Sequence, residues 1–140
     1  VATRSDPNFK IIARTDARTT LGLDEALRRG EAYARAGADI LFIESPETQE
    51  EMSRIGRTFP NHPLIANMVE KGRTPVLSQA ELEQFGYKIA IFPVTALLAS
   101  VQAMTNVYEH FKHTGSSIHN PVDLYDFSSR SKISIFNVVS

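Results

Sequence analysis

Four short apolar runs divide the chain, and helical patterns separate them. The runs predict strands at residues 9–13, 39–43, 64–66 and 88–92. The strongest run, Ile40–Ile43, is continuously apolar, which is typical of a strand covered on both faces in a parallel sheet. Between the runs, apolar residues recur every three or four positions, which predicts amphipathic helices. These helices are expected at residues 24–36, 49–58, 79–85 and 95–114.

Residues at the predicted helix ends suit those positions. Asp24 can cap the first helix with its side-chain oxygen, and a polar loop is expected before it, from Arg14 to Gly22. Gly37 is expected to end this helix in a left-handed conformation. Thr48 and Ser78 each precede a glutamate by three residues, which is the spacing of a capping box at a helix start.

The last helix carries a regular apolar seam, which we expect to be buried. Its members are Leu97, Val101, Met104, Tyr108 and Phe111. After Gly115 the periodicity ends, which predicts a domain at residues 1–115 and a linker with a C-terminal docking segment at 116–140. Residues 133–139 could form a further strand, and the anchors expected for the docking segment are Leu124, Tyr125 and Phe127.

The alternation of strands and helices predicts an α/β fold with about four parallel strands and right-handed crossovers. Four such units could form a small open sheet or half of an eight-stranded (β/α)8 TIM-type barrel, and periodicity alone does not distinguish the two. The chain begins with Val1 and not with methionine. This favours a piece of a longer protein, and we therefore expect half a barrel.

Composition and charge are ordinary for a soluble globular chain. The 140 residues are 42% apolar and 22% charged, with a formal net charge of −1. Nucleic acid is not expected as a partner, because positive and negative charges are nearly balanced. A membrane is not expected either, because no apolar run approaches the roughly 20 residues that span a bilayer. Cysteine is absent, which excludes disulfides and thiolate chemistry within this stretch and fits a cytoplasmic location.

Polar residues stand at the carboxyl ends of all four predicted strands. They are Arg14, Glu44, Asn67 and Thr95. In a βα-repeating protein the carboxyl ends of parallel strands share one rim, and the active site is built there. We therefore expect these residues to belong to one substrate-binding site, although dozens of residues separate them in sequence.

Arg14 and Glu44 each have a functional and a structural interpretation. A guanidinium can bind a carboxylate or phosphate through two parallel hydrogen bonds, but Arg14 could also form a structural salt bridge with Asp16 or Glu44. Glu44 ends the most apolar strand, where a carboxylate is costly to desolvate unless it is paired. It could bind a substrate, help to hold a metal through water or orient Arg14, or it could be a charge near a helix N-terminus before Pro46.

Asn67 and Thr95 also each have a functional and a structural interpretation. An amide both donates and accepts, which suits a carboxylate or enolate oxygen, but Asn67 could instead be a turn residue bonded to its own backbone. Thr95 could bind a ligand or cap the last helix. The charged residues of the loop after the third strand are expected in solvent: Glu70, Lys71 and Arg73.

Other chemistries have weaker support in the sequence. The histidines show no spacing suited to a metal site: His62, His110, His113 and His119. The sequence has no glycine-rich nucleotide loop and no nucleophile elbow, which argues against a Rossmann fold. A Schiff-base aldolase is also disfavoured, because the candidate strand lysines, Lys10 and Lys88, stand at strand starts, away from the expected rim.

Five segments resemble the isocitrate lyase/phosphoenolpyruvate mutase superfamily in order and spacing. They are Ile11–Arg18, Gly22–Ala26, Gly37–Glu44, Ala66–Glu70 and Phe92–Leu97. The resemblance implies the C-terminal half of a (β/α)8 barrel whose last helix swaps onto a neighbouring subunit, hence a homo-oligomer. It also implies a lyase or mutase that acts on a C–C or C–P bond in a small dicarboxylate or phosphonate, with Mg²⁺ and an enolate-like intermediate.

The resemblance also assigns residues. It implies that Arg14 binds a substrate carboxylate, that Glu44 lies by the substrate and the metal's waters, and that Asn67 binds a second carboxylate. The metal ligands and the catalytic cysteine of the family are expected in an N-terminal half that this sequence does not contain. No catalytic residue and no metal ligand is therefore assigned here, and the fragment should not complete the reaction by itself.

Two positions depart from the methylisocitrate lyases of this superfamily. Those enzymes usually carry threonine where this chain has Val69 and arginine where it has Leu98. Both differences remove polar contacts to a tricarboxylate, which favours the branch that contains dimethylmalate lyase, oxaloacetate hydrolase and the phosphonomutases. The competing hypothesis is a non-catalytic βα fragment that acts as an interaction module, with its open sheet edge covered by a partner.

Overall fold

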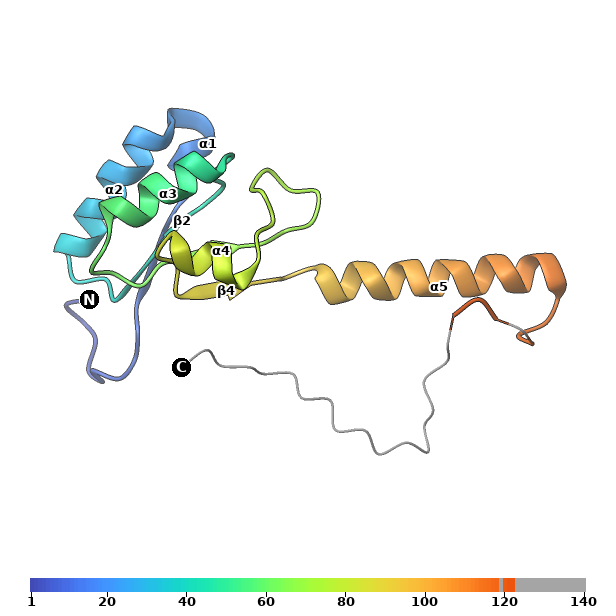
Figure 1. Ribbon diagram of the computed structural model, residues 1–140. Helices are drawn as coiled ribbons and strands as arrows, with labels where there is room; N and C mark the ends of the chain where they lie inside the picture. The colour runs from blue at the N-terminus through green and yellow to red at the C-terminus, as the bar shows by residue number, and fades with distance from the viewer. Residues whose placement is uncertain (119, 123–140) are drawn as a thin grey trace. The chain divides into compact units, whose positions relative to one another are not determined.

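Strands and helices alternate along the chain in the computed structural model, which describes residues 1–118 and 120–122 (Figure 1). The described residues contain β1 (Ile12–Thr15), α1 (Ala17–Leu21), α2 (Leu23–Arg35), β2 (Ile40–Ile43), α3 (Gln49–Thr58), β3 (Ile65–Asn67), α4 (Gln79–Gln84), β4 (Ile89–Ile91) and α5 (Thr95–Thr114). The chain divides into two units, residues 1–96 and 97–140. The predicted boundary near residue 115 stays a prediction, because most of the segment that follows it lies outside the described residues.

All strand pairs in the first unit are parallel. β1 pairs with β2, with Arg14 opposite Phe42, and β3 pairs with β4, with Asn67 opposite Ile91. A single parallel bridge between Leu41 and Leu64 joins β2 to β3. The four strands therefore follow one another in chain order, and their carboxyl ends lie at one edge, as the sequence predicts.

One face of β1 and β2 is covered by helices, whereas every residue of β4 is exposed. α2 packs against β1 and β2, and α3 lies beside α2 (Figure 1). The core between them is apolar, and burial of each large side chain stabilises the fold by roughly 1.5–3 kcal/mol. Its largest fully buried members are Leu41, Met52, Ile55, Leu64 and Met68. Met52 and Ile55 of α3, and Phe59 directly after the helix, are buried in this core.

The other face of the strands carries apolar side chains that remain accessible. Ile12 is 51% exposed, Ile89 is 37% exposed and Ile91 is 40% exposed. Side chains alternate between the two faces of a strand, so Arg14 shares the face of Ile12, and Asn67 shares the face of its neighbour Ile91. Arg14 and Asn67 therefore lie on the strand face opposite the one that packs on α2.

Two of the predicted helix ends are confirmed in full, and a third is confirmed in part. Ser78 and Glu81 form the full capping box at α4. Thr48 caps α3 by accepting the backbone N–H of Glu51 at 3.1 Å, but the Glu51 carboxylate bonds to Glu47 and Arg18 and does not return to Thr48. Gly37 has φ +91° just after α2, which is the left-handed geometry expected there.

The segment before α2 differs from its prediction as a polar loop. It contains α1, whose first turn is supported by the Thr15 hydroxyl, which accepts the backbone N–H of Ala17 at 3.2 Å. Gly22, with φ +85°, then stands at the N-cap of α2. Asp24 is consequently inside the helix, where it pairs with Arg54 at 2.5 Å instead of capping. Glycine adopts a positive φ at little cost, so the N-cap lies two residues before Asp24 and α2 begins at Leu23.

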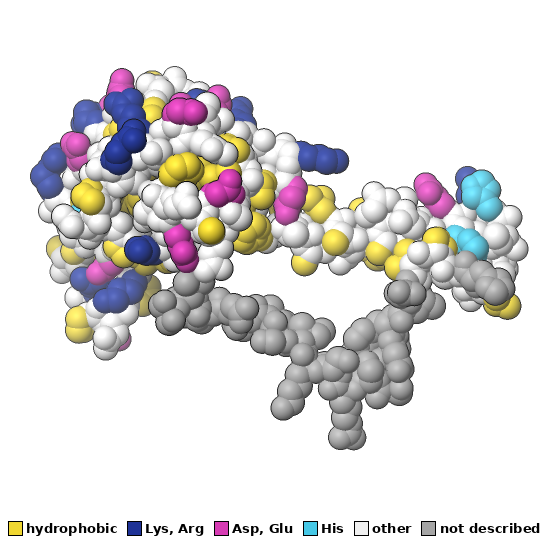
Figure 2. Space-filling model, viewed as in Figure 1, with side chains coloured by type: hydrophobic (Ala, Val, Ile, Leu, Met, Phe, Trp, Pro, Cys, Tyr) yellow, Lys and Arg dark blue, Asp and Glu magenta, His cyan; other side chains and the backbone are white. Residues whose placement is uncertain are grey.

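The expected burial of the α5 seam is wrong for the described residues. No α5 residue is buried, and hydrophobic side chains lie open along the helix in Figure 2. An amphipathic helix buries its apolar stripe only against another layer, and the described residues of this unit provide none. No helix in the described part of the chain is long and apolar enough to cross a membrane. The expected anchors and the strand at 133–139 lie outside the described residues.

Candidate active site

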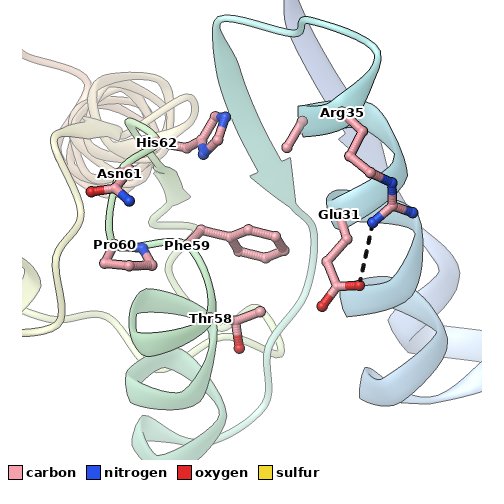
Figure 3. Close-up of a pocket in the computed structure, with 8 residues that line it drawn as sticks. Glu31, Arg35, Thr58, Phe59, Pro60, Asn61 and His62 are labelled. Atoms are coloured by element: carbon pink, nitrogen blue, oxygen red, sulfur yellow. Dashed lines mark ion pairs between the residues drawn. The ribbon is translucent and has the colours of Figure 1, made fainter.

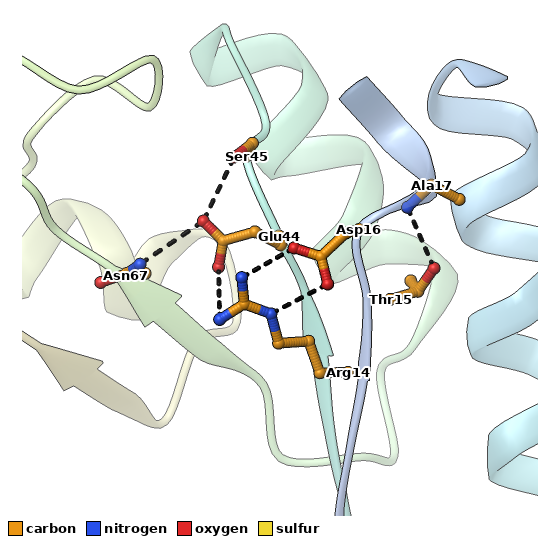
Figure 4. Close-up of polar contacts among 7 residues, drawn as sticks. All are labelled: Arg14, Thr15, Asp16, Ala17, Glu44, Ser45 and Asn67. Atoms are coloured by element: carbon orange, nitrogen blue, oxygen red, sulfur yellow. Dashed lines mark hydrogen bonds and ion pairs between the residues drawn. The ribbon is translucent and has the colours of Figure 1, made fainter. Parts of the chain in front are cut away.

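Three of the four predicted site residues meet at the carboxyl ends of neighbouring strands. Arg14 stands in β1, Glu44 follows β2 and Asn67 ends β3. Arg14 Nη1 lies 3.5 Å from Glu44 Oε2, and Asn67 Nδ2 donates to Glu44 Oε1 at 3.4 Å (Figure 4). The predicted convergence of residues from three βα units is therefore present in the structure.

Glu44 is the centre of this cluster. Its side chain is only 13% exposed, and its Oε1 also accepts the Ser45 hydroxyl at 3.2 Å. Its Oε2 is buried and has no hydrogen-bond donor among the described residues, although Arg14 pairs with it electrostatically. The interpretation as a helix N-terminal charge is wrong, because α3 begins at Gln49 and is capped by Thr48.

Arg14 lies between two carboxylates. Its Nε and Nη2 donate to Asp16 at 3.1 and 2.7 Å, and its guanidinium lies 4.9 Å from the centre of the Phe42 ring. The hydrogen bond from Arg14 holds the pKa of Asp16 below its ordinary value, and the same bond raises the pKa of Arg14. The salt bridges considered in the structural interpretation are therefore present. The Arg14 side chain is still 47% exposed, so a ligand carboxylate can reach it.

Asn67 bonds across the sheet and not to its own turn. Because Glu44 is a carboxylate and can only accept, the amide nitrogen of Asn67 faces it. The amide oxygen, Oδ1, is buried and has no partner among the described residues. A buried acceptor without a donor costs roughly 1–3 kcal/mol, and a ligand hydroxyl or amide could remove that cost.

Thr95 is not part of this cluster. It begins α5, and its hydroxyl donates to Glu70. Within the described part of the chain, no hydrogen bond or ion pair links Thr95 to Arg14, Glu44 or Asn67. Thr95 therefore contacts a different carboxylate, that of Glu70, and not Glu44.

Glu70 is a residue whose position the sequence did not reveal. It was expected in solvent, but it is half-buried, and its Oε2 is buried without a hydrogen-bond partner among the described residues. The next residue, Lys71, has φ +59°, a conformation that is uncommon outside glycine. The one indication in the sequence that Glu70 has a specific position was its place in Ala66–Glu70, one of the five segments that resemble the superfamily.

A shallow cavity lies at the opposite end of the strands. It measures about 270 Å³ and opens where α2 and α3 end (Figure 3). The chain runs from this end of α3 into the start of β3, so the cavity belongs to the amino-terminal edge, away from Arg14 and Glu44. It is lined by Glu31, Ala34, Arg35, Thr58, Phe59, Pro60, Asn61 and His62.

A divalent cation does not fit the described residues alone. Glu44 Oε2 is an oxygen of the kind that Mg²⁺ prefers, but the described residues hold no group of three acidic, histidine or cysteine side chains suited to a metal. The described residues can therefore offer one carboxylate toward such an ion but no complete site.

Comparison with known proteins places the chain in a family. The phosphoenolpyruvate phosphomutase family model matches residues 1–112. The chain belongs to this family, within the PEP mutase/isocitrate lyase superfamily. The superfamily inferred from the sequence motifs is thereby confirmed, and its members that resemble this chain include named lyases and phosphomutases.

Two curated relatives and one solved structure show the degree of similarity. The chain is 57% identical over 113 residues to 2,3-dimethylmalate lyase of Eubacterium barkeri, covering 81% of this chain and 39% of the relative. It is 38% identical over 127 residues to 2-methylisocitrate lyase of Bacillus subtilis (strain 168), covering 91% and 41%. Oxaloacetate acetylhydrolase in complex with its product oxalate superposes with a TM-score of 0.74 at 29% identity, covering 78% of this chain and 38% of that one. The chain thus spans about two fifths of the length of these proteins.

Proposed function

We propose that the full-length protein is a Mg²⁺-dependent lyase or mutase that cleaves or rearranges a C–C or C–P bond in a small 2-oxo or 2-hydroxy dicarboxylate. The reaction would pass through an enolate-like intermediate. The observation that carries the proposal is the contact of Arg14, Glu44 and Asn67 at three adjacent strand ends. It is supported by 57% identity to a named dicarboxylate lyase.

In this proposal the fragment supplies substrate-positioning groups. Arg14 binds one substrate carboxylate through its charged fork. Glu44 orients Arg14 and Asn67, and its Oε2 remains able to accept a hydrogen bond from the substrate. Asn67 offers its free amide oxygen and its second N–H to the substrate. Thr95 contributes through its link to Glu70. The metal ligands and the catalytic acid and base are expected outside this chain.

Two apolar residues support a substrate of the dimethylmalate type over a tricarboxylate. Val69 is half-buried after β3, and Leu98 stands in the first turn of α5. Neither side chain can hydrogen-bond a third carboxylate. The greater identity to the dimethylmalate lyase than to the methylisocitrate lyase agrees with this assignment.

We also propose that the four βα units are the C-terminal half of a (β/α)8 barrel in a homo-oligomer of the cytoplasm. The exposed isoleucines on the uncovered strand face would then line a barrel interior that four further strands complete. The open apolar seam of α5 would pack on a neighbouring subunit. Both arrangements would bury apolar side chains that are exposed in the described part of the chain.

A substrate assay separates this proposal from the non-catalytic alternative. The purified full-length protein, with Mg²⁺ present, is expected to release a 2-oxo acid from a 2-hydroxy dicarboxylate such as 2,3-dimethylmalate. Removal of the divalent ion with a chelator should abolish the reaction, and its return should restore it. A protein that turns over none of the 2-hydroxy, 2-oxo and phosphonate candidates would favour an interaction module.

A further inference from the structure

The loop after Glu44 is held by one arginine from the preceding βα unit. Arg18, on α1, donates from Nε and Nη2 to Glu51 on α3 at 3.0 and 2.8 Å. Its Nη1 lies 2.5 Å from Oε1 of Glu47, which is in the loop itself. Glu51 also accepts the backbone N–H of Glu47 at 2.7 Å. One guanidinium therefore ties both the loop and the helix that follows it to α1.

The loop contains a backbone conformation that needs such support. Ser45 has φ +58°, and the next residue is Pro46. A non-glycine residue in the left-handed region costs of order 1–3 kcal/mol and persists only where its surroundings impose it. A residue before proline also prefers extended geometry. In this conformation the Ser45 hydroxyl turns back and donates to Glu44 Oε1 at 3.2 Å (Figure 4).

Arg18 differs from the ordinary surface arginines of the chain. Its side chain is 17% exposed and that of Glu51 is 21% exposed, whereas Arg28, which forms a comparable forked pair with Glu25 on α2, is 67% exposed. The hydrogen bond from Arg18 holds the pKa of Glu51 below its ordinary value. A pair that is largely shielded from water is screened less by salt than one on an open helix surface.

We propose that Arg18 is a positioning residue for the substrate site. Through Glu47 and Glu51 it fixes the loop in which Ser45 orients the Glu44 carboxylate toward Arg14 and Asn67. It acts on the reaction without touching substrate. This inference rests on the proposed function, because that function assigns Glu44 to the site.

The test compares matched arginine variants of the full-length protein. Arg18→Gln is expected to lower kcat/KM by roughly 10- to 100-fold, the loss expected when a catalytic group is misplaced by about an ångström. It should also speed hydrogen exchange at the Glu47 amide. Arg18→Lys should recover part of both effects, because an ammonium can pair with one carboxylate but cannot form the fork. Arg28→Gln is the control and should match the wild type.

The variants are assayed under conditions in which circular dichroism shows them to be folded. Their kinetics then show whether Arg18 positions the substrate site. Arg18→Gln kinetics equal to those of Arg28→Gln would overturn the proposal, and so would faster exchange with unchanged kinetics. If Arg18→Gln does not fold, Glu47→Gln takes its place, because this variant keeps the Arg18–Glu51 pair. Glu47→Gln is expected to lower kcat/KM by a smaller factor than Arg18→Gln would. An unchanged kcat/KM in Glu47→Gln would refute the positioning role of Arg18. A wild type that is inactive on every candidate refutes the proposed function instead, and Glu47 exchange then tests the loop contact alone.

Discussion

Replacing Arg14 with alanine in the full-length protein is expected to lower kcat/KM by roughly 30- to 5,000-fold, which corresponds to about 2–5 kcal/mol of transition-state binding. The variant would remove the guanidinium that binds a substrate carboxylate in the proposed site. It would also leave Glu44 without its ion pair, although Ser45 and Asn67 would still donate to this buried carboxylate. Steady-state kinetics on the substrate of the wild-type protein measure the effect.

Arg54→Ala is a matched control for this variant. Arg54 is 51% exposed, close to the 47% of Arg14, and it also pairs with an aspartate, Asp24. Exposed pairs of this kind contribute about 0–1 kcal/mol, so the control should retain activity within a few-fold of the wild type. Arg14→Lys should fall between the two, because lysine keeps the charge and loses the fork. Near-wild-type kinetics in Arg14→Ala would contradict the assignment.

Gly56→Ala is expected to destabilise the fold by about 3 kcal/mol or more, at the upper end of the range for overpacking. Gly56 lies in α3, where a Cβ atom would stand 1.7 Å from the backbone oxygen of Phe85 and 2.8 Å from its carbonyl carbon. That oxygen belongs to the backbone at the end of α4, so it cannot rotate away as a side chain would. Either α3 or the end of α4 must move, and both frame the apolar core.

Urea unfolding of the full-length protein measures this loss. Arg57→Ala changes the adjacent, exposed position of the same helix and serves as the control. It should alter the unfolding free energy by about 0.5 kcal/mol or less, as surface substitutions usually do. Equal stability of Gly56→Ala and Arg57→Ala would show that the backbone of α3 at Gly56 does not lie as close to the Phe85 carbonyl as in this structure.

The order of strands and helices was predictable because the apolar patterns are strong. Ile40–Ile43 is continuously apolar, and the seam of α3 repeats at helical spacing. The beginning of α2 was not predictable from Asp24 alone, because Gly22 takes the N-cap position and shifts the helix start. The exposure of the α5 seam also could not be deduced, since an apolar seam shows that a helix can pack but not whether a neighbouring layer is present.

The convergence of Arg14, Glu44 and Asn67 followed from topology, since parallel strand ends share one rim. The details that support this cluster did not follow. The left-handed conformation of Ser45 is opposed by the local preference of a residue before proline, so no local signal could have indicated it. Glu70 was assigned to solvent because polar loops usually are solvated, but the Thr95 hydroxyl and a partly buried position hold it in place.

A crystal structure of the full-length protein with a small dicarboxylate bound would show directly whether Arg14, Glu44 and Asn67 form the substrate site. We expect a ligand carboxylate at hydrogen-bond distance, about 2.7–3.2 Å, from the Arg14 guanidinium, with Asn67 and Glu44 beside it. We also expect further strands that close a barrel over Ile12, Ile89 and Ile91. A diacid bound in the cavity at the ends of α2 and α3, with Arg14 still paired only with Asp16 and Glu44, would show that these strand ends are not the substrate site.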